Sequence, residues 1–355
     1  MLLIPMVIQP IKIENKELKS GQVFIIAEAG INHNGDLDIA TKLINEAKKS
    51  GADAVKFQTY KTENLVIKDA PLAKYQKVEA AKIEDQFKLL KKYELSFSDF
   101  EYLKEYCDEK GIIFLSSPFD VESAKFLSQL NVSAYKIPSG EIINPPLLKQ
   151  VAKTGKPIIM STGMANLCDI EYALNCFYSE RNSKIILLHC VSNYPARVED
   201  YNLKSIDTLR KTFGHLTGIS DHSPGYIIPV MSVALDSVVV EKHLTLDKSM
   251  EGPDHKASLD LHEFKEMVEA VRLAEQALGS GIKKPIPSEL EISKVARKSL
   301  TSSMDISKGE YFTYDNISIR RPGFGMEPKN IELIIGKKAS KDIPKDSLIT
   351  WDMVE

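Results

Sequence analysis

The stretch VFIIAEAGINHNGD, residues 23–36, decides the fold. Its first five residues form an uninterrupted apolar run, which is typical of a strand buried on both faces of a parallel sheet. Directly after this run stand an acid, a histidine, two asparagines and two glycines, namely Glu28, His33, Asn32, Asn34, Gly30 and Gly35. Polar side chains gathered where a buried strand ends predict a functional site at that end of a sheet.

Seven similar apolar runs follow, and longer amphipathic stretches separate them. Helical patterns such as DIATKLINEAKKSG (38–51) lie between the runs, with Gly51 predicted as the C-cap. Eight strand–helix units of about 30 residues predict an α/β fold, a (β/α)₈ (TIM) barrel. A doubly wound open sheet is the alternative. The runs are 23–28, 54–58, 112–116, 134–138, 157–162, 185–189, 216–220 and 237–243.

Length and charge narrow the class of protein. A chain of 355 residues exceeds the usual size of one core and predicts a large domain with a smaller one. Its net charge of −3 argues against nucleic-acid and membrane-surface partners. No CxxC pair occurs among the four cysteines, and neither a signal peptide nor a membrane span is predicted, so we expect a cytoplasmic protein.

The pattern changes after ALGSGIKKPIPSE (277–289), a stretch that is typical of a linker. Beyond it, DISKGEYFTYDNI (305–317) and DIPKDSLITWDMV (342–354) form a weak internal repeat. The repeat predicts a small β domain of two similar clips, too small to bury much core alone. The predicted boundaries are a barrel over 1–281, a linker over 282–292 and the small domain over 293–355.

Every predicted strand delivers polar groups to one rim of the barrel, where the active site of this fold lies. Two lysines, Lys56 and Lys136, lie within the second and fourth runs, and hydroxyls stand at the ends of the third, fourth, fifth and seventh. This combination favours a phosphate-sized anion, and lysines that point outward are the alternative. The rim residues are Glu28, Lys56, Gln58, Ser116, Ser117, Lys136, Ser139, Glu141, Ser161, Thr162, His189, Asn193, Tyr194, Ser220, Asp221, His222, Glu241, Lys242 and His243.

Two histidines, His222 and His243, end neighbouring runs near Glu28 and predict a divalent metal. The alternative is a pair of core histidines with ordinary hydrogen bonds. His33 is either a third ligand or a residue that bonds the backbone of its own loop. We interpret His189 and Glu241 as structural.

Nine motifs together resemble the sialic acid synthase family of nonulosonic acid synthases, from about residue 20 to the C-terminus. The resemblance implies a metal-dependent barrel followed by an antifreeze-like (SAF, β-clip) domain. It also implies condensation of phosphoenolpyruvate with an N-acetylated mannose-type sugar and release of phosphate. The motifs are AEAGINHNGD, VKFQTY, SSPFD, YKIPSGE, STGMA, LLHCVSNYP, SDHSPG, EKHLTLDKSMEGPDHKASL and RRPGFG.

The resemblance also implies roles for individual residues. His222 and His243 would hold Mn²⁺ or Mg²⁺, and Arg321 would reach the site of a homodimer partner from the swapped small domain and hold the sugar's acetamido group. Ser192 departs from the Asn of some sialic acid synthases, which leaves the sugar open. The implied phosphoenolpyruvate contacts are Lys56, Ser117, Lys136, Ser139, Ser161 and Ser220. The residues implied to face the sugar and the reacting atoms are Glu28, Gln58, Glu141, Tyr194 and Asp254.

The resemblance implies N-acetylneuraminic acid as the product, formed by cleavage of the C–O bond of phosphoenolpyruvate. Glu141 is the candidate for proton transfer, and Glu28 for positioning oxygens. Legionaminate synthesis is the first alternative and pseudaminate synthesis the second. A lysine-dependent aldolase with Lys136 as Schiff base, and a carbohydrate- or ice-binding protein, are the competing classes.

Overall fold

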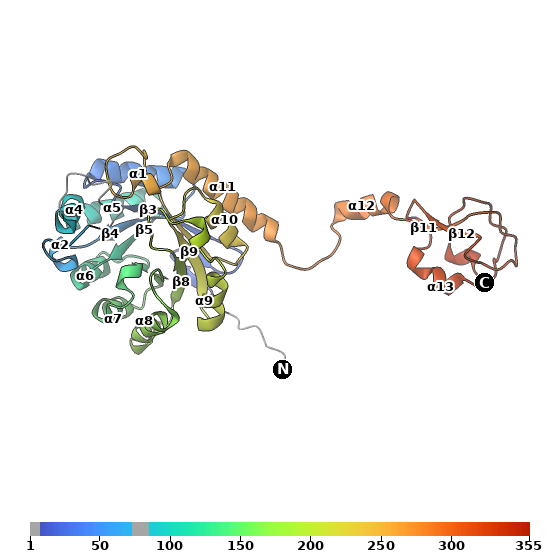
Figure 1. The fold of residues 1–355 in the computed structure, drawn as a ribbon, viewed down its shortest axis with the longest axis horizontal. Helices are drawn as coiled ribbons and strands as arrows, with labels where there is room; N and C mark the ends of the chain where they lie inside the picture. Colours follow the sequence, from blue (N-terminus) through green and yellow to red (C-terminus); the bar gives the residue numbers. More distant parts are fainter. Residues whose placement is uncertain (1–7, 73–84) are drawn as a thin grey trace. The chain divides into compact units, whose positions relative to one another are not determined.

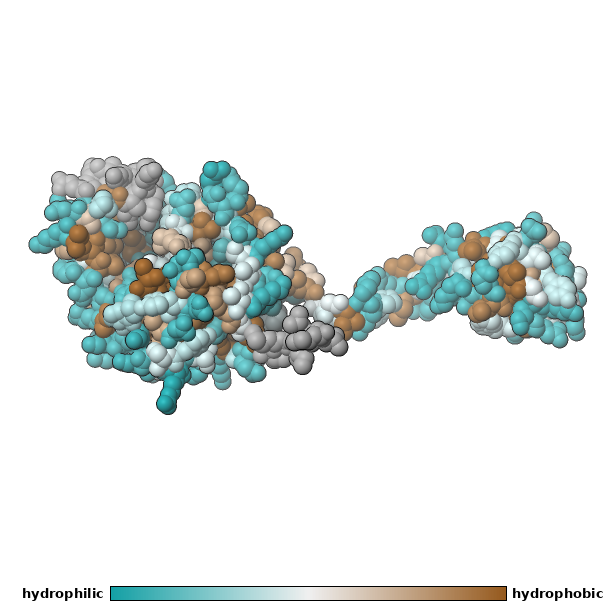
Figure 2. Space-filling model, turned by 60° about the horizontal axis from the view of Figure 1, so that its bottom comes forward, coloured by the Kyte–Doolittle hydropathy of each residue, from teal (hydrophilic) through white to brown (hydrophobic). Residues whose placement is uncertain are grey.

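The computed structural model describes residues 8–72 and 85–355. The chain divides into two compact units, Met1–Gly279 and Ser280–Glu355, each described here by itself. Among the described residues, no helix is both long and apolar enough to cross a membrane. On the face shown in Figure 2, hydrophobic residues lie among hydrophilic ones on both units.

Eight parallel strands form the centre of the first unit, hydrogen-bonded in the order β5-β4-β3-β10-β9-β8-β7-β6. The two end strands, β5 and β6, also lie against each other, so the sheet is a nearly closed barrel (Figure 1). Each predicted apolar run forms one strand, which confirms the (β/α)₈ barrel and excludes the doubly wound sheet. The strands are β3 (Phe24–Gly30), β4 (Ala54–Thr59), β5 (Ile113–Pro118), β6 (Tyr135–Ile137), β7 (Ile158–Ser161), β8 (Ile185–Cys190), β9 (Leu216–Asp221) and β10 (Val239–His243).

Helices surround the strands (Figure 1). The first begins after Asp36, whose side chain accepts hydrogen bonds from two backbone N–H groups of the first turn. It ends at the C-cap Ser50, one position before the predicted cap Gly51, which follows with φ +85°. The helices are α1 (Leu37–Lys49), α2 (Thr62–Leu65), α4 (Gln86–Tyr93), α5 (Phe97–Lys110), α6 (Val121–Gln129), α7 (Pro145–Ala152), α8 (Leu167–Ser179), α9 (Ser205–Phe213), α10 (Ile227–Val233) and α11 (Leu261–Leu278).

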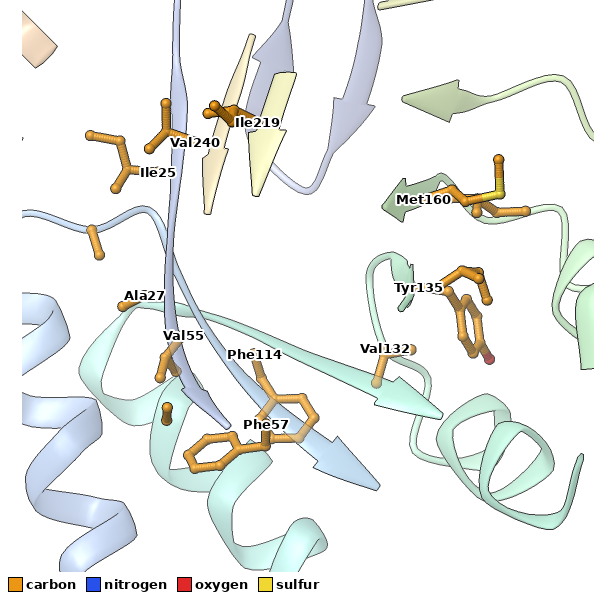
Figure 3. Packing of buried hydrophobic residues seen from close by; sticks show 14 of the residues in the cluster. Ile25, Ala27, Val55, Phe57, Phe114, Val132, Tyr135, Met160, Ile219 and Val240 are labelled. Carbon is orange, nitrogen blue, oxygen red and sulfur yellow. The ribbon is translucent and has the colours of Figure 1, made fainter. Parts of the chain in front are cut away.

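Alternate residues of each strand face opposite sides of the barrel wall. On β3, Ile25 and Ala27 pack in the cluster between strands and helices (Figure 3), whereas Phe24 and Ile26 belong to the cluster inside the barrel. A hairpin of β1 (Ile11–Ile13) and β2 (Lys16–Leu18) adds apolar side chains to the interior cluster. The next inward residue of β3 is Glu28, so the interior changes from apolar to polar toward the carboxyl ends of the strands.

One interior position has no room for a side chain. A Cβ atom on Gly218 of β9 would lie 2.3 Å from the carbonyl oxygen of Val239 and 2.9 Å from Leu188 Cδ2. We expect Gly218→Ala to lower the free energy of unfolding by about 1–3 kcal/mol, as overpacking of a core does, measured by urea denaturation. Gly140→Ala is the control, because a Cβ there meets nothing within 4 Å. Equal stability of the two variants would contradict the prediction.

The second unit has a buried hydrophobic core of its own, although the sequence predicts a domain too small to bury much apolar surface. Strands β11 (Ser299–Ser302) and β12 (Ile317–Arg320) pair antiparallel, and α13 spans Ile331–Ile334. The two copies of the internal repeat meet, since Ile306 pairs with Ile343 in a β-bridge. Helix α12 (Pro287–Ala296) occupies part of the predicted linker and has no buried residue. The exact domain boundaries stay a prediction.

Candidate active site

Two lysines and two glutamates alternate inside the barrel, at the carboxyl ends of its strands. Lys56 Nζ lies 2.6 Å from Glu28 Oε2 and 4.0 Å from Glu241 Oε2. Lys136 Nζ lies 3.4 Å from Glu241 Oε1. All four side chains are buried. The two positive and two negative charges compensate one another. A single buried charge without a partner would instead carry a large desolvation cost.

Hydroxyl groups surround this cluster. Lys56 Nζ donates to Ser117 Oγ at 3.1 Å, and Lys136 Nζ donates to Ser161 Oγ at 2.6 Å. Ser220 Oγ donates to Glu241 Oε1 at 2.9 Å. The predicted anion contacts of strands β4, β5, β6, β7 and β9 therefore meet at one place.

The environment shifts the ionisation of these groups. Burial raises the pKa of Glu28 to about 7, although Lys56 opposes the shift. Burial would also raise the pKa of Glu241, but Lys136 and Lys56 lower it overall. Burial lowers the pKa of Lys136, which Glu241 partly offsets. The four groups therefore depend on one another for their charges.

Ser139 lies at the edge of the cluster. Its Oγ accepts from the N–H of Gly163 at 2.9 Å, and a Cβ on Gly163 would lie 2.8 Å from that oxygen and 2.2 Å from Ser192 Oγ. Gly163 therefore leaves space that the hydroxyls of Ser139 and Ser192 border. Cys190 Sγ lies 3.3 Å from the same Cβ position.

The two predicted metal ligands are neighbours. The ring centroids of His222 and His243 are 5.4 Å apart, and the ring of Tyr194 lies 4.1 Å from that of His222. His222 Nδ1 lies 2.9 Å from the carbonyl oxygen of Val191, which only accepts, so Nδ1 carries the proton. In the neutral ring, Nε2 of His222 then holds the lone pair that a metal needs.

His243 provides a second test of the metal prediction. Its Nδ1 atom is buried without a hydrogen-bond partner and lies 3.9 Å from Asp254 Oδ2. Burial and the neighbouring His222 lower the pKa of His243 well below its ordinary value, so the ring is neutral. Burial raises the pKa of Asp254 to about 6. A neutral imidazole beside a carboxylate fits a divalent cation.

The residues that the structure describes do not complete such a site by themselves. Within residues 8–72 and 85–355, no group of three or more histidine, cysteine, aspartate or glutamate side chains is arranged to hold a metal ion. Two histidines would leave several coordination positions for oxygens of substrate and water, as catalytic metal sites do. The metal itself stays a prediction.

The asparagines of the opening stretch connect two loops. Asn32 Nδ2 donates to the carbonyl oxygen of Leu244 at 2.9 Å and to Ser258 Oγ at 2.8 Å. Ser258 Oγ in turn donates to the carbonyl oxygen of Asp254 at 2.6 Å. The loop after β3 therefore holds the loop after β10, which carries Asp254.

A second set of bonds joins the same loops. Asn34 Nδ2 donates to the carbonyl oxygen of Glu251 at 3.0 Å, and His255 Nε2 lies 3.1 Å from Asn34 Oδ1. His33 Nδ1 accepts from the N–H of Gly35 at 3.0 Å. His33 therefore bonds the backbone of its own loop, which is the second of the two alternatives that the sequence left open.

The remaining predicted residues differ in their surroundings. Gln58 Nε2 donates to Glu28 Oε1 at 3.1 Å and so belongs to the cluster. Glu141 accepts from Asn144 Nδ2 at 2.6 Å, and no hydrogen bond or ion pair joins it to the two lysines in the described part of the chain. Arg321 lies in the second unit, where its Nε donates to the carbonyl oxygen of Ala296 at 2.9 Å. Its contact with a partner's barrel stays a prediction.

Two residues at the site were not predicted from the sequence as functional. From the sequence, Glu241 is interpreted as structural, whereas the structure places its carboxylate between Lys56 and Lys136. The alternation of side chains along a strand could have indicated this position of Glu241, because residues 241 and 243 of one strand face the same side. Cys190 Sγ lies 3.8 Å from His222 Nδ1, and no sequence pattern indicated this contact. The four cysteines are free.

Known proteins match the chain over most of its length. It matches the NeuB family over residues 43–283 and the SAF domain over residues 297–355. It is 46% identical to the N,N'-diacetyllegionaminic acid synthase of Campylobacter jejuni over 92% of this chain and 99% of that one. It is 43% identical to the pseudaminic acid synthase of the same organism over 91% and 94%.

A solved structure agrees with these matches. The N-acetylneuraminic acid (sialic acid) synthetase of Leptospira borgpetersenii is similar with a TM-score of 0.71 at 36% identity, over 80% of this chain and 95% of that one. The barrel, the rim residues and these relatives lead to one conclusion. The protein belongs to the NeuB family of nonulosonic acid synthases and carries a SAF domain after its barrel.

Proposed function

We propose that the protein condenses phosphoenolpyruvate with an N-acetylated mannose-type sugar and water, giving a nonulosonic acid and phosphate. Carbon 3 of phosphoenolpyruvate forms the new bond to the sugar's aldehyde carbon, and water adds at carbon 2. The bond between carbon 2 and the phosphate oxygen then breaks. The observation that carries the proposal is the buried cluster of Lys56 and Lys136 with its hydroxyls, at the same end of the barrel as His222 and His243.

The lysine cluster suits phosphoenolpyruvate because it combines point charges with neutral donors. Lys56 and Lys136 offer ammonium groups, and Ser117 and Ser161 already bond them and hold them in place. Such preorganised donors stabilise negative charge without reorganising during the reaction. Glu241 balances both lysines before the substrate enters, which keeps the empty site from carrying an excess of positive charge.

The histidine pair suits the sugar end of the reaction. A divalent cation, Mn²⁺ or Mg²⁺, held by His222 and His243, would polarise the aldehyde oxygen as a Lewis acid. Tyr194 packs against the His222 ring and limits the space above it. Asp254 lies beside His243 and is placed to accept hydrogen bonds from sugar hydroxyls.

Glu28 is the better placed of the two candidate carboxylates for proton transfer. Its pKa of about 7 lies near neutral pH, where a general base is most effective. It also contacts Lys56 directly, whereas Glu141 bonds Asn144. Burial raises the pKa of Glu141 as well, so it remains the second candidate.

The relatives favour a different sugar from the one that the sequence predicts first. Within one organism, the chain is more similar to the legionaminic acid synthase (46%) than to the pseudaminic acid synthase (43%). We therefore propose the diacetamido-trideoxy sugar of N,N'-diacetyllegionaminic acid as substrate, ahead of N-acetylmannosamine. The four free cysteines support a cytoplasmic location for this reaction.

Phosphate release with each candidate sugar tests the proposal. The protein is incubated with phosphoenolpyruvate, a divalent cation and one sugar of the legionaminic, sialic or pseudaminic type. We expect the highest kcat/KM with the legionaminic precursor. Phosphoenolpyruvate with ¹⁸O at its bridging oxygen should deliver the label to inorganic phosphate. Label in the sugar product would instead mean P–O cleavage, and no release with any sugar would contradict the proposed reaction.

Arg321 is proposed to hold the sugar's acetamido group in the site of a dimer partner. It is exposed, and apart from the bond from its Nε the described residues offer it no hydrogen bond. Phe324, three residues on, is 62% exposed and offers an apolar contact beside it. We expect Arg321→Ala to raise the sugar KM roughly 10- to 100-fold, as loss of a charged hydrogen bond of about 1.5–3 kcal/mol does.

Complementation tests whether Arg321 acts across a dimer. His222→Ala and Arg321→Ala proteins are mixed and allowed to exchange subunits, and activity should return because one site of each mixed dimer is intact. Arg320→Ala is the matched control, since Arg320 pairs with Asp346 within its own unit. Absence of recovery despite demonstrated exchange would mean that Arg321 serves its own chain.

A further inference from the structure

A fully buried ion pair lies in the barrel wall directly beside the two histidines. Lys242 Nζ lies 2.5 Å from Asp221 Oδ2, and neither side chain is exposed to solvent. The two residues are register partners on the neighbouring strands β9 and β10. His222 follows Asp221 in the chain, and His243 follows Lys242.

The pair lies in the layer between strands and helices, beside apolar side chains of the outer cluster. Strand alternation turns Asp221 and Lys242 away from the interior, toward the helices, as it does Ile219 and Val240, which pack in the outer cluster. A buried ion pair is weak evidence for stability, because apolar residues of similar volume often stabilise as well or better. A role other than stability therefore has to explain the charges.

The hydrogen bonds of the pair lead to the backbone around His222. Asp221 Oδ1 accepts from the N–H of Ser223 at 2.9 Å, and Lys242 Nζ donates to the Ser223 carbonyl oxygen. The N–H of His222 itself donates to the hydroxyl of Tyr201 at 2.7 Å. The backbone on both sides of His222 is thus fixed, although it lies just past the end of β9.

The same pair holds the second histidine. Lys242 is the residue before His243, so its bond to Asp221 ties the end of β10 to the turn that carries His222. On its other side, the carbonyl oxygen of His243 accepts from the N–H of Leu259 at 2.9 Å. The cross-strand bond between Lys242 and Asp221, together with the pairing of β9 and β10, therefore constrains the backbone that carries both histidines.

We propose that Asp221 and Lys242 are positioning residues, which hold His222 and His243 at the spacing that a divalent cation requires. The proposal rests on the metal site of the proposed function. In this proposal the buried ion pair holds the two metal ligands in place without contacting the metal itself. Loss of such a supporting interaction typically weakens metal affinity 10- to 100-fold.

Metal affinity separates positioning from stability. Asp221→Leu combined with Lys242→Met removes both charges and keeps the volume, and Asp221→Asn keeps the shape of the carboxylate. Mn²⁺ is titrated into metal-free protein and the free ion is followed by electron paramagnetic resonance. We expect both variants to bind Mn²⁺ about 10- to 100-fold more weakly than the unaltered protein. Turnover should recover as the Mn²⁺ concentration is raised.

Asp53→Asn is the matched control. Asp53 also bridges two elements in a largely buried ionic network of the same barrel, with Arg272 Nη2 at 2.8 Å, but it precedes β4 at the opposite end. Its Mn²⁺ affinity should be unchanged. Thermal unfolding of each variant shows whether it folds.

The outcomes distinguish the two proposals. If the unaltered protein binds no Mn²⁺, the metal site of the proposed function fails and the positioning role with it. If it binds Mn²⁺ and both variants bind equally well, only the positioning role is overturned. Failure of both variants to fold would overturn it too, because the pair would then serve stability.

Discussion

Chelation of divalent cations is expected to abolish phosphate release, and added Mn²⁺ or Mg²⁺ to restore it. The reason is chemical, because carbon 3 of phosphoenolpyruvate is a weak nucleophile and requires a polarised aldehyde. A Lewis acid contributes several kcal/mol to such a step, and about 4 kcal/mol corresponds to roughly 10³-fold in rate. Full activity in excess chelator would contradict the metal site.

His222→Ala should have an effect of the same size. The substitution removes one of the two imidazoles. It also removes the hydrogen bond from His222 Nδ1 to the carbonyl oxygen of Val191, which keeps the bond from the N–H of Asn193. We expect kcat/KM to fall at least about 10³-fold, with a folded protein in thermal unfolding. His262→Ala is the control, because His262 is an exposed histidine on α11, with a side chain that is 83% exposed. Near-normal activity of His222→Ala would require different ligands.

The sequence predicted the barrel well because its strands are buried on both faces and therefore read as apolar runs. It predicted the rim from the same runs, since a polar residue at the end of such a strand has few other places to lie. Lys56, Lys136, Ser117, Ser161 and Ser220 meet as expected.

Contacts between segments that are distant along the chain could not be predicted from the sequence. The bonds from Asn32 to Leu244 and Ser258 join residues more than 200 positions apart. The pairing of Asp221 with Lys242 depends on the register of β9 against β10, which local patterns do not determine. The sequence likewise did not predict the position of the loop that carries Asp254 or the arrangement of charges around Glu241.

Lys136→Met should lower kcat/KM for phosphoenolpyruvate roughly 10²- to 10⁴-fold. Two losses combine to about 3–5 kcal/mol, namely a charged hydrogen bond to the substrate and the cation that compensates buried Glu241. With Lys136 gone, the carboxylate of Glu241 keeps Lys56 at 4.0 Å and the hydroxyl of Ser220, and it repels an entering anion more strongly. Lys153→Met is the control, because Lys153 is exposed at the end of α7.

A second substitution separates an anion-binding lysine from a Schiff-base lysine. In Lys136→Met combined with Glu241→Gln, the cluster has lost one charge of each sign, so repulsion of the substrate is relieved. If Lys136 acts by its charge, the double variant should bind phosphoenolpyruvate at least about tenfold more tightly than Lys136→Met in calorimetric titration, because an unpaired buried carboxylate costs several kcal/mol. If Lys136 forms a Schiff base, removal of Glu241 restores nothing, and borohydride with pyruvate should attach pyruvate to Lys136. We expect tighter binding by the double variant and no borohydride adduct. The reason is that Lys136 lies between Glu241 and the Ser161 hydroxyl. These are the polar surroundings of an anion site, whereas an amine that forms a Schiff base is activated in an apolar pocket.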